Sequence, residues 1–406
     1  MELPEHILTG YKVLDFTHVL AGPSATRILV EMGAEVIKVE FPPTGDITRL
    51  LPMIKNGRSG YYMQQNRGKK SVCIDAKSEA GHGVIDRLIE QVDIVIENFA
   101  PGVASRIGID WAHVHEVNPK VVMCSISAFG QDGPLSELPG FDYIAQAYAG
   151  VTGMIGEPHG PPYFPLLGLG DVSTGMHAAC AIGFALLHRE RTGIGQYLDI
   201  SLLDAYYHCH ELNVQIYSAS DGEIEPTRSG MHHFAVCPLG LFKGRDHYIF
   251  IIALGNQWKQ LCAAMGRPEL ADDGPYETND GRVERQDEVN RIVQEWVDTK
   301  SSDDEILAAL RAERVPCAPV LSIAETVREP HLRERGTIRT VSDPRFGEVE
   351  LPGMPLRFSE YPHNIPLDSA HLGEHNAEVL SEMLGYSEAE IQALYDDGVL
   401  HANPDT

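Results

Sequence analysis

The feature that most constrains this chain is a regular alternation of short apolar runs and amphipathic helical patterns in its first 130 residues. Apolar runs of strand length occupy residues 11–16, 34–39, 71–74, 93–96 and 121–125. Helical patterns lie between them, at 22–32, where Gly33 follows as a C-terminal cap, and at 78–91. Strands that alternate with helices pair in parallel through right-handed crossovers. The alternation therefore predicts an α/β fold with a doubly wound, mostly parallel sheet.

The rest of the 406-residue chain is long enough for a second domain. From Phe141 the pattern becomes mostly helical, with expected helices at 171–189 and 201–217, before a polar, turn-rich stretch. Strands and helices resume near Phe234, and two further helices close the chain. We predict a large domain formed by 1–220 and 326–406, with a smaller α/β domain and its linkers at 221–325.

Charge excludes some classes of partner. The formal net charge of −26 argues against a nucleic-acid-binding protein and against attraction to an anionic membrane surface. Residues 1–80, however, carry ten Lys and Arg against nine Asp and Glu. This local balance is either statistical scatter or the mark of a site for an anionic ligand.

The beginning of the chain has no basic and apolar signal pattern, and no apolar run reaches the roughly 18–20 residues of a membrane helix. The seven cysteines are widely scattered and include no C-x-x-C pair. Unpaired, reduced thiols are typical of a cytoplasmic protein, which is the location we expect.

The glycine motifs by which many parallel-sheet proteins bind phosphate are missing from this sequence. The sequence contains no G-x-x-x-x-G-K-[ST], and the turn after the first strand lacks G-x-G-x-x-G, which disfavours a nicotinamide dehydrogenase. A metal site is not expected either, since His208 and His210 would point in different directions on a helix.

Asp171 is the strongest catalytic candidate. It follows Gly168-Leu-Gly170 and is expected to open a long helix, where free backbone N–H groups and the helix dipole would keep the carboxylate ionised. An ionised carboxylate flanked by glycines can act as a nucleophile. The simpler alternative is a plain helix cap.

A basic cluster lies in the N-terminal region. Arg67-Gly-Lys-Lys70 is followed by Lys77 and Arg106, near predicted carboxyl ends of strands. Such groups could hold the phosphates of a nucleotide. The alternative is a solvated loop.

Taken together, these segments resemble the family III CoA-transferases, the group that includes formyl-CoA transferase and carnitine CoA-transferase and is related to α-methylacyl-CoA racemase. The resemblance covers nearly the whole chain, and its motifs occur in the family's order. They are Val13-Leu-Asp-Phe16, Ala21-Gly-Pro-Ser24, Gly33-Ala-Glu-Val-Ile-Lys-Val-Glu40, Asn66-Arg-Gly-Lys-Lys-Ser71, Glu97-Asn-Phe-Ala-Pro-Gly102, Gly170-Asp-Val-Ser-Thr-Gly-Met-His177, Leu187-His-Arg-Glu-Arg-Thr-Gly193 and Leu372-Gly-Glu-His375.

The resemblance implies that Asp171 attacks a donor acyl-CoA, forming an aspartyl mixed anhydride and CoA thiolate, before CoA passes to an acceptor carboxylic acid. Coenzyme A and acyl-CoA would be substrates, with no permanently bound cofactor. Succinyl-CoA or another dicarboxylic acyl-CoA is the expected donor. The implied CoA contacts are Leu20, Ala21, Ile74, Asp75, Ala76, Lys77, Asn98, Phe99, Ala100, Arg106, Phe141 and Asp142.

Three departures from the family pattern affect what is expected. Racemases carry a histidine base in a Gly-His-Asp segment that reads Gly-Phe-Asp here, with Phe141 in its place. Phe41 replaces an arginine found in some members. Oxalate-using enzymes have a run of consecutive glycines in the small domain, and the comparable stretch here, 229–240, is shorter, which disfavours an oxalate acceptor. Arg228, His232 or His233 in or near this stretch could meet an acceptor carboxylate. A racemase and a non-catalytic CoA-binding dimer are the alternatives.

The resemblance also implies the assembly. The family fold is an interlocked homodimer in which each ring-like chain threads the other, with a central small domain. The expected partners of this chain are therefore a second copy, an acyl-CoA and a small carboxylic acid.

Overall fold

The computed structural model describes residues 5–272 and 274–405. The chain divides into two compact units. The first comprises residues up to Ala149, Leu166–Cys209 and residues from Pro330 onward, and the second comprises Gly150–Pro165 and His210–Glu329. The predicted boundaries lie at 220 and 325, whereas the stretches 150–165, 210–220 and 326–329 group with the second unit. The assignment of functional domains to 1–220, 221–325 and 326–406 stays a prediction.

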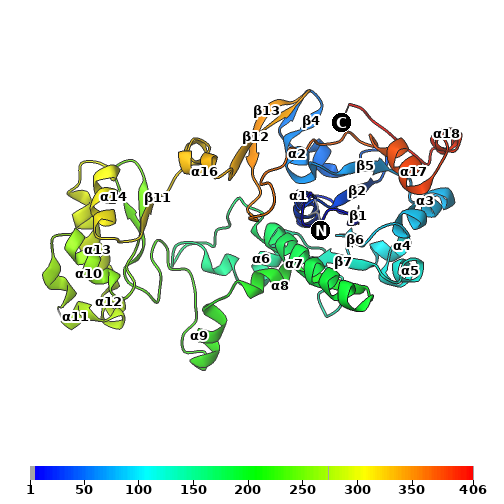
Figure 1. The fold of residues 1–406 in the computed structure, drawn as a ribbon. Coiled ribbons are helices and arrows are strands. Elements are labelled where there is room, and N and C mark those ends of the chain that lie inside the picture. Colours follow the sequence, from blue (N-terminus) through cyan, green and yellow to red (C-terminus); the bar gives the residue numbers. More distant parts are fainter. Residues whose placement is uncertain (1–4, 273, 406) are drawn as a thin grey trace. The chain divides into compact units, whose positions relative to one another are not determined.

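The first unit is built on a six-stranded sheet (Figure 1). Its strands are β1 (Lys12–Asp15), β2 (Glu35–Glu40), β5 (Lys70–Cys73), β6 (Ile94–Glu97), β7 (Val122–Ser127) and β8 (Gln196–Ser201). They lie in the order β5-β2-β1-β6-β7-β8, and every neighbouring pair is parallel. The doubly wound parallel sheet expected from the sequence is confirmed. Strand β8 was not expected, because it lies in a region whose overall pattern is helical.

Helices cover both faces of this sheet. Successive strand residues point to opposite faces, so the strands contribute apolar side chains to a core on each side. Leu14, Ile37 and Val95 are fully buried in a core that they share with α3 (Glu79–Ile89), α5 (Trp111–Val117) and α17 (Asn376–Leu384). The other face is covered by α1 (Ala21–Glu31) and α7 (Leu169–Thr192), which pack on the sheet and on each other.

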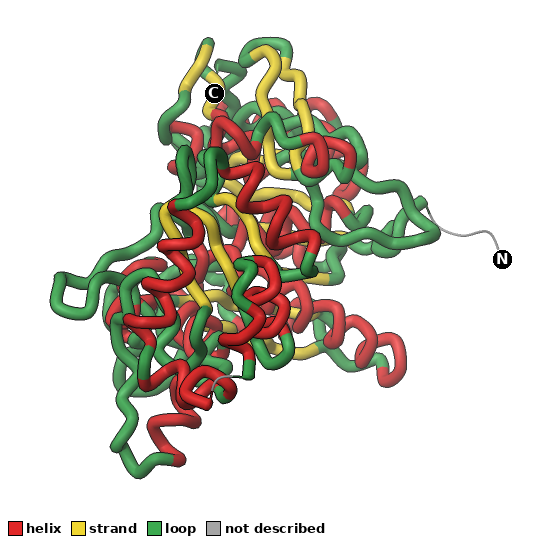
Figure 2. Tube along the Cα trace, turned by 90° about the vertical axis from the view of Figure 1, so that its left-hand side faces the viewer, coloured by secondary structure: helices red, strands yellow, loops and turns green. Residues whose placement is uncertain are grey.

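Shorter elements complete the first unit. They are η1 (Ile47–Leu50), β3 (Ile54–Lys55), β4 (Arg58–Ser59), α2 (Gly60–Asn66), α4 (Val103–Arg106), α6 (Asp142–Tyr148), α8 (Leu202–His208), α16 (Pro330–Glu334), β12 (Ile338–Asp343), β13 (Gly347–Pro352) and α18 (Glu388–Asp396). Figure 2 distinguishes helices, strands and the loops between them along the whole trace. The expected single helix at 201–217 is wrong: α8 ends at His208, and α9 (Asn213–Ala219) begins only after the chain has left the first unit.

The second unit contains the antiparallel sheet β11-β10-β9, formed by β9 (Leu239–Lys243), β10 (Tyr248–Ile252) and β11 (Cys317–Pro319). Trp258, Val293 and Ile306 are buried in its separate core. Its helices are η2 (Thr152–Met154), α9, α10 (Gln257–Ala264), η3 (Pro268–Ala271), α11 (Gly274–Glu277), α12 (Asn279–Glu284), α13 (Gln286–Asp298), α14 (Asp303–Ala312) and α15 (Ile323–Thr326). Among the described residues of both units, no helix combines the length and apolarity needed to cross a bilayer.

The packing of α1 on α7 gives a stability prediction. A Cβ atom at Gly175 would lie 2.8 Å from the carbonyl oxygen of Ala21, whereas one at Gly183, on the same helix, would meet nothing within 4 Å. Gly175→Ala should lower the free energy of unfolding by about 1–3 kcal/mol through overpacking. Gly183→Ala should be neutral or stabilise by up to about 1 kcal/mol. Urea unfolding measures both, and equal effects would contradict the close packing of the two helices.

Candidate active site

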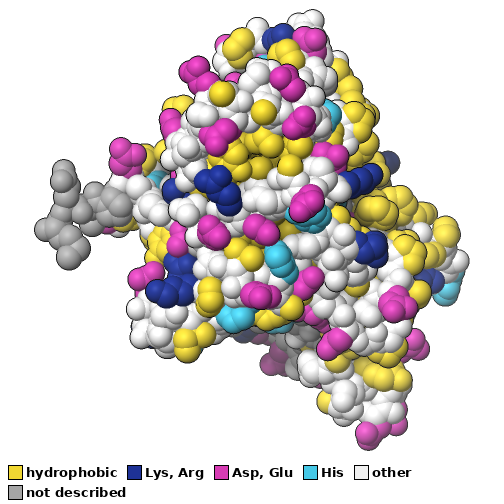
Figure 3. Space-filling model, turned by 90° about the vertical axis from the view of Figure 1, so that its right-hand side faces the viewer, with side chains coloured by type: hydrophobic (Ala, Val, Ile, Leu, Met, Phe, Trp, Pro, Cys, Tyr) yellow, Lys and Arg dark blue, Asp and Glu magenta, His cyan; other side chains and the backbone are white. Residues whose placement is uncertain are grey.

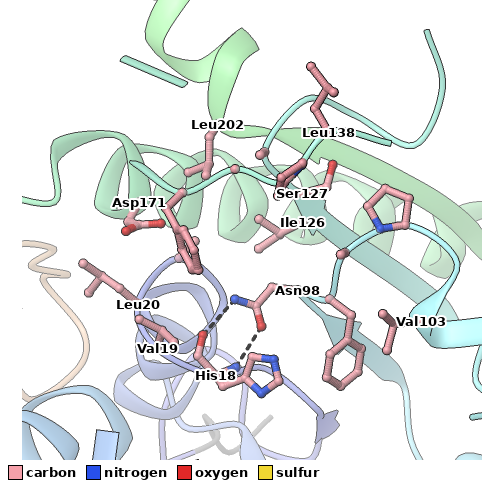
Figure 4. A pocket seen from close by; sticks show the side chains of 18 of the residues that line it. His18, Val19, Leu20, Asn98, Val103, Ile126, Ser127, Leu138, Asp171 and Leu202 are labelled. Carbon is pink, nitrogen blue, oxygen red and sulfur yellow. Dashed lines mark hydrogen bonds between the residues drawn. The ribbon is translucent and has the colours of Figure 1, made fainter. Parts of the chain in front are cut away.

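A pocket of about 390 Å³ opens in the first unit at the carboxyl ends of three neighbouring strands (Figure 4). The segment after β1 contributes His18, Val19, Leu20 and Ala21, the segment after β6 contributes Asn98–Pro101 and Val103, and β7 with its following loop contributes Ile126, Ser127, Ala128, Ser136 and Leu138–Phe141. Asp171 and Leu202 complete the lining.

The pocket lies at the point where the strand order reverses. From β1 the chain moves to β2 on one side, and it later returns to place β6 on the other side of β1. The loops that leave β1 and β6 therefore diverge, and ligands of parallel α/β sheets bind in such crevices. The Asn98 side chain joins the two loops, because it accepts a 2.8 Å hydrogen bond from His18 N and donates one of 2.8 Å to His18 O.

Asp171 reaches this pocket from the first turn of α7. The helix begins at Leu169 with Gly168 as its N-terminal cap, so Asp171 is the third helical residue and not the cap residue that the sequence suggested. Gly170 allows the close approach of Tyr206, because a Cβ atom there would lie 2.1 Å from the tyrosine ring. The glycines before Asp171 thus permit tight packing at the start of the helix.

The charge state of Asp171 differs from the expectation. Burial, and secondly the neighbouring Asp142 carboxylate, raise the pKa of Asp171 to about 7. The prediction that the helix N-terminus keeps this group ionised as an ordinary carboxylate is wrong, because desolvation of the charged form outweighs the helix dipole here. The result is a carboxylate that is unusually basic and only partly ionised near neutral pH.

Asp142 is held against the first turn of α7 by hydrogen bonds. Its Oδ2 accepts the backbone N–H of Asp171 at 3.1 Å, and its Oδ1 accepts the hydroxyl of Tyr206. Gln146 Nε2 donates to the same hydroxyl at 3.1 Å. Burial, followed by the hydrogen bond to Asp142, raises the pKa of Tyr206, so the phenol remains a neutral donor. The Asp142 carboxylate is therefore fixed beside Asp171.

The pKa of Tyr61, on α2, is also affected by the charge of Asp171. This pKa is raised to about 12 by burial, then by the negative charge of Asp171 and that of Asp46. Neither Tyr61 nor Tyr206 was identified from the sequence, because each reaches the site from an element distant in the chain. His18, Ser127 and Leu138 were also missed, although His18 and Ser127 lie at or just beyond strand ends, which is a usable signal.

The implied CoA contacts fall into two groups. Leu20, Ala21, Asn98, Phe99, Ala100 and Phe141 line the pocket, with Asp142 directly behind Asp171. Residues 74–77 follow β5 and Arg106 ends α4, and these positions are not part of the lining. Ile74 is fully buried in the core, whereas Lys77 and Arg106 are exposed. Contact of all of these residues with CoA stays a prediction.

Within the basic cluster, Arg67, Lys69 and Lys70 do not offer free cations to a phosphate group. Lys69 Nζ lies 3.0 Å from Asp15, and Arg67 Nη2 lies 2.6 Å from Glu31, with all four side chains buried. Lys70 pairs with Glu35 at 2.7 Å. For Arg67 and Lys69, both interpretations, a phosphate site and a solvated loop, are wrong, because these two charges neutralise buried acids, whereas the Lys70–Glu35 pair is partly exposed. On the face shown in Figure 3, Lys and Arg side chains are interspersed with Asp and Glu.

The three candidate acceptor contacts belong to the second unit. Arg228 Nη1 donates to Gly153 O at 3.1 Å, and His233 Nδ1 accepts from Ala235 N at 3.1 Å. Burial lowers the pKa of His232, whose Nδ1 is buried and makes no hydrogen bond within the described chain. Within residues 5–272 and 274–405, no group of three or more His, Cys, Asp or Glu side chains is arranged to hold a metal ion.

The chain is similar in sequence and in fold to known proteins. The model of CoA-transferase family III matches residues 8–376. A formyl-CoA:oxalate CoA-transferase of Streptomyces avermitilis is 35% identical over 97% of this chain and 99% of its own. A succinyl-CoA:glutarate CoA-transferase of Homo sapiens is 33% identical over 97% and 90%. The crystal structure of a CAIB/BAIF family protein from Brucella suis is 32% identical, with a TM-score of 0.81 over 93% of this chain and 100% of that one.

The Asp142–Asp171 pair gives a prediction for titration. Asp142→Asn removes the neighbouring negative charge and should lower the pKa of Asp171 below about 7, while burial keeps it above the ordinary value. Carboxyl-carbon NMR of the wild-type and variant proteins measures this. Asp132→Asn, at an exposed position of the same unit, should leave the midpoint unchanged. A midpoint that stays or rises in Asp142→Asn would contradict the electrostatic coupling.

Proposed function

The chain belongs to CoA-transferase family III and is a CoA-transferase that acts between an acyl-CoA and a carboxylic acid, and we propose that Asp171 is its nucleophile. The observation that carries this proposal is the position of Asp171. It is a half-buried carboxylate with a raised pKa, in the lining of a pocket at the switch point of the sheet.

The first half of the reaction transfers the donor acyl group to the enzyme. An oxygen of ionised Asp171 attacks the thioester carbonyl, the C–S bond breaks, and CoA leaves as the thiolate, with a mixed anhydride on Asp171. The thiolate then attacks the aspartyl carbonyl, which releases the donor acid and leaves an aspartyl-CoA thioester. Because each species is an activated acyl group, no external energy source is needed, and covalent catalysis divides the exchange into feasible steps.

The second half repeats these steps with the acceptor. Its carboxylate attacks the aspartyl-CoA thioester, which gives a second mixed anhydride and CoA thiolate. Attack of the thiolate on the acceptor acyl carbon forms the new acyl-CoA and frees Asp171. The raised pKa of Asp171 serves this chemistry because a more basic carboxylate is a better nucleophile when ionised, and at about 7 a useful fraction is ionised at neutral pH.

We propose small dicarboxylic acids as the substrate class, with succinyl-CoA or a related acyl-CoA as donor. The relatives that act on succinyl-CoA with glutarate and on formyl-CoA with oxalate support a dicarboxylic partner. A second carboxylate calls for cationic or hydrogen-bonding partners, and Arg228, His232 and His233 are the proposed ones. CoA itself is proposed to contact the expected residues that line the pocket, together with Asp142, residues 74–77 and Arg106.

The proposed assembly is an interlocked homodimer in the cytoplasm, with coenzyme A bound only as substrate. Exposed apolar side chains on α7, among them Val172, Phe184 and Leu187, support burial against a second copy. The free state of all seven cysteines supports a reducing compartment.

The nucleophile is tested by Asp171→Asn. Transfer, followed by mass spectrometry across a panel of acyl-CoAs and acids, should fall at least about 10³-fold because the attacking oxygen is lost. The exposed Asp132→Asn variant should transfer at the wild-type rate. Wild-type protein given acyl-CoA and hydroxylamine should acquire a hydroxamate at Asp171. Full transfer by Asp171→Asn would refute the proposal.

Racemisation is tested separately. At the position of the racemase histidine, the Phe141 side chain is 74% exposed and cannot transfer a proton. We expect no exchange of solvent deuterium into the α-position of a 2-methylacyl-CoA. Rapid exchange at that carbon would favour the racemase alternative.

A further inference from the structure

The segment Thr17–Val19, within the connection from β1 to α1, has its backbone held by side chains that are buried or half-buried. Thr17 N donates to Asp15 Oδ1 at 2.8 Å, and Thr17 O accepts from Lys38 Nζ at 2.5 Å. Both backbone groups of His18 bond to Asn98, as described above. Val19 N donates to Asp46 Oδ1 at 3.3 Å. Five consecutive polar groups of this loop are therefore fixed by side chains.

Val19 has an unusual backbone conformation. Its φ of 68° lies in the left-handed region, which a β-branched residue rarely adopts. Such a conformation persists only when the surroundings enforce it, and strained residues cluster at functional sites. Val19 itself lines the pocket, and the hydrogen bond from its N–H to Asp46 acts directly at the strained residue.

Lys38 and Asp46 act on the loop as one unit. Lys38 Nζ lies 3.1 Å from Asp46 Oδ2, and each side chain is only 1% exposed. The lysine holds the carbonyl of Thr17, and the aspartate holds the N–H of Val19, so the ion pair bridges the two ends of the segment. Burial works against both charges, yet the partners keep the pKa of Lys38 raised and that of Asp46 lowered, so both stay ionised.

The loop leads directly to the nucleophile. Leu20, the next residue, lies against the start of α7, because a Cβ atom at Gly168 would be 2.4 Å from Leu20 Cδ2 and 3.7 Å from Asp171 Cβ. Figure 4 shows Val19 and Leu20 beside Asp171 in the pocket wall. A displacement of this loop would therefore move the surface against which a thioester must lie to meet Asp171.

We propose that the buried Lys38–Asp46 pair is a positioning device for the transfer reaction, which clamps Val19 in its left-handed conformation and so sets the pocket wall beside Asp171. The role rests on the proposed function of Asp171 as nucleophile. Neither Lys38 nor Asp46 touches the reacting atoms. Their effect on the reaction passes through the backbone of Thr17–Leu20.

The test is a double-mutant cycle with two substitutions. Asp46→Ala removes the side chain that holds the loop, and Val19→Gly removes the backbone strain. Asp46→Ala should lower kcat/KM for transfer by about 10²-fold, since misplacement of a wall by about an ångström has that effect. Val19→Gly alone should lower kcat/KM by less than about tenfold, because glycine adopts positive φ freely. Combined with Val19→Gly, the Asp46→Ala variant should regain at least about tenfold in kcat/KM. A purely structural role of Asp46 predicts that kcat/KM of the four proteins changes only in proportion to their folded fraction, which urea unfolding measures in parallel.

Asp343→Ala is the matched control. It breaks the buried Arg58–Asp343 pair of the same unit, at 3.0 Å, whose residues do not line the pocket. It should lower the free energy of unfolding but leave kcat/KM at the wild-type value. If Asp46→Ala does not fold, Asp46→Asn replaces it throughout, since it removes the charge while preserving the side chain's shape.

Hydrogen exchange at the amides of Thr17–Val19 separates this inference from the proposed function. These amides should exchange at least about tenfold faster in Asp46→Ala than in wild type or Asp343→Ala. If wild-type protein transfers no CoA, the proposed function fails, and exchange alone then decides whether the clamp exists. Unchanged exchange, unchanged kcat/KM in Asp46→Ala, or no recovery in the combined variant would each overturn the inference.

Discussion

Pairing of buried charges beneath the pocket is the constraint on which the rest of the first unit depends. Asp15, Lys38, Asp46 and Lys69 lie at or near the carboxyl ends of β1 and β2 and the start of β5, and each is buried. Isolated charges would be costly in this position, and removal of one partner of a buried pair typically costs about 3–5 kcal/mol. The pairing explains why the N-terminal fifth is nearly neutral in an otherwise acidic chain. Among its cations, Lys38, Arg49 and Lys69 neutralise buried acids at or after the carboxyl ends of β1 and β2, from which the active-site loops leave.

Asp171 contrasts with these paired carboxylates. The carboxyl of Asp15 is fully buried, whereas Asp171 is half-buried, yet Lys69 and Lys38 hold the pKa of Asp15 below the usual value despite that burial. At Asp171 burial acts together with the second carboxylate of Asp142, and both raise the pKa. The same fold thus keeps one set of acids permanently ionised for structure and leaves another basic enough for chemistry. Tyr206 completes the arrangement by holding Asp142 in place.

Much of this organisation could be predicted from the sequence because it depends on local pattern. The strands around Val13, Val36 and Ile94 have short apolar runs, and the position of Asp171 after Gly168 and Gly170 has a recognisable motif. What failed depends on tertiary contacts. The partners of Arg67, Lys69 and Lys70 are distant in sequence, so exposed and buried cations look alike. The pKa of Asp171 could not be foreseen because helix position suggests one sign, whereas burial and Asp142 impose the other.

The most direct test of the covalent role of Asp171 follows the oxygen atoms. During turnover with an acceptor acid whose carboxylate carries heavy oxygen, one labelled oxygen should be left on Asp171 when CoA attacks the second anhydride. Peptide mass spectrometry after turnover should find the label in the peptide that contains Asp171, and the same treatment without donor acyl-CoA should leave it unlabelled. Labelled product acyl-CoA together with an unlabelled Asp171 would show direct transfer and contradict the account.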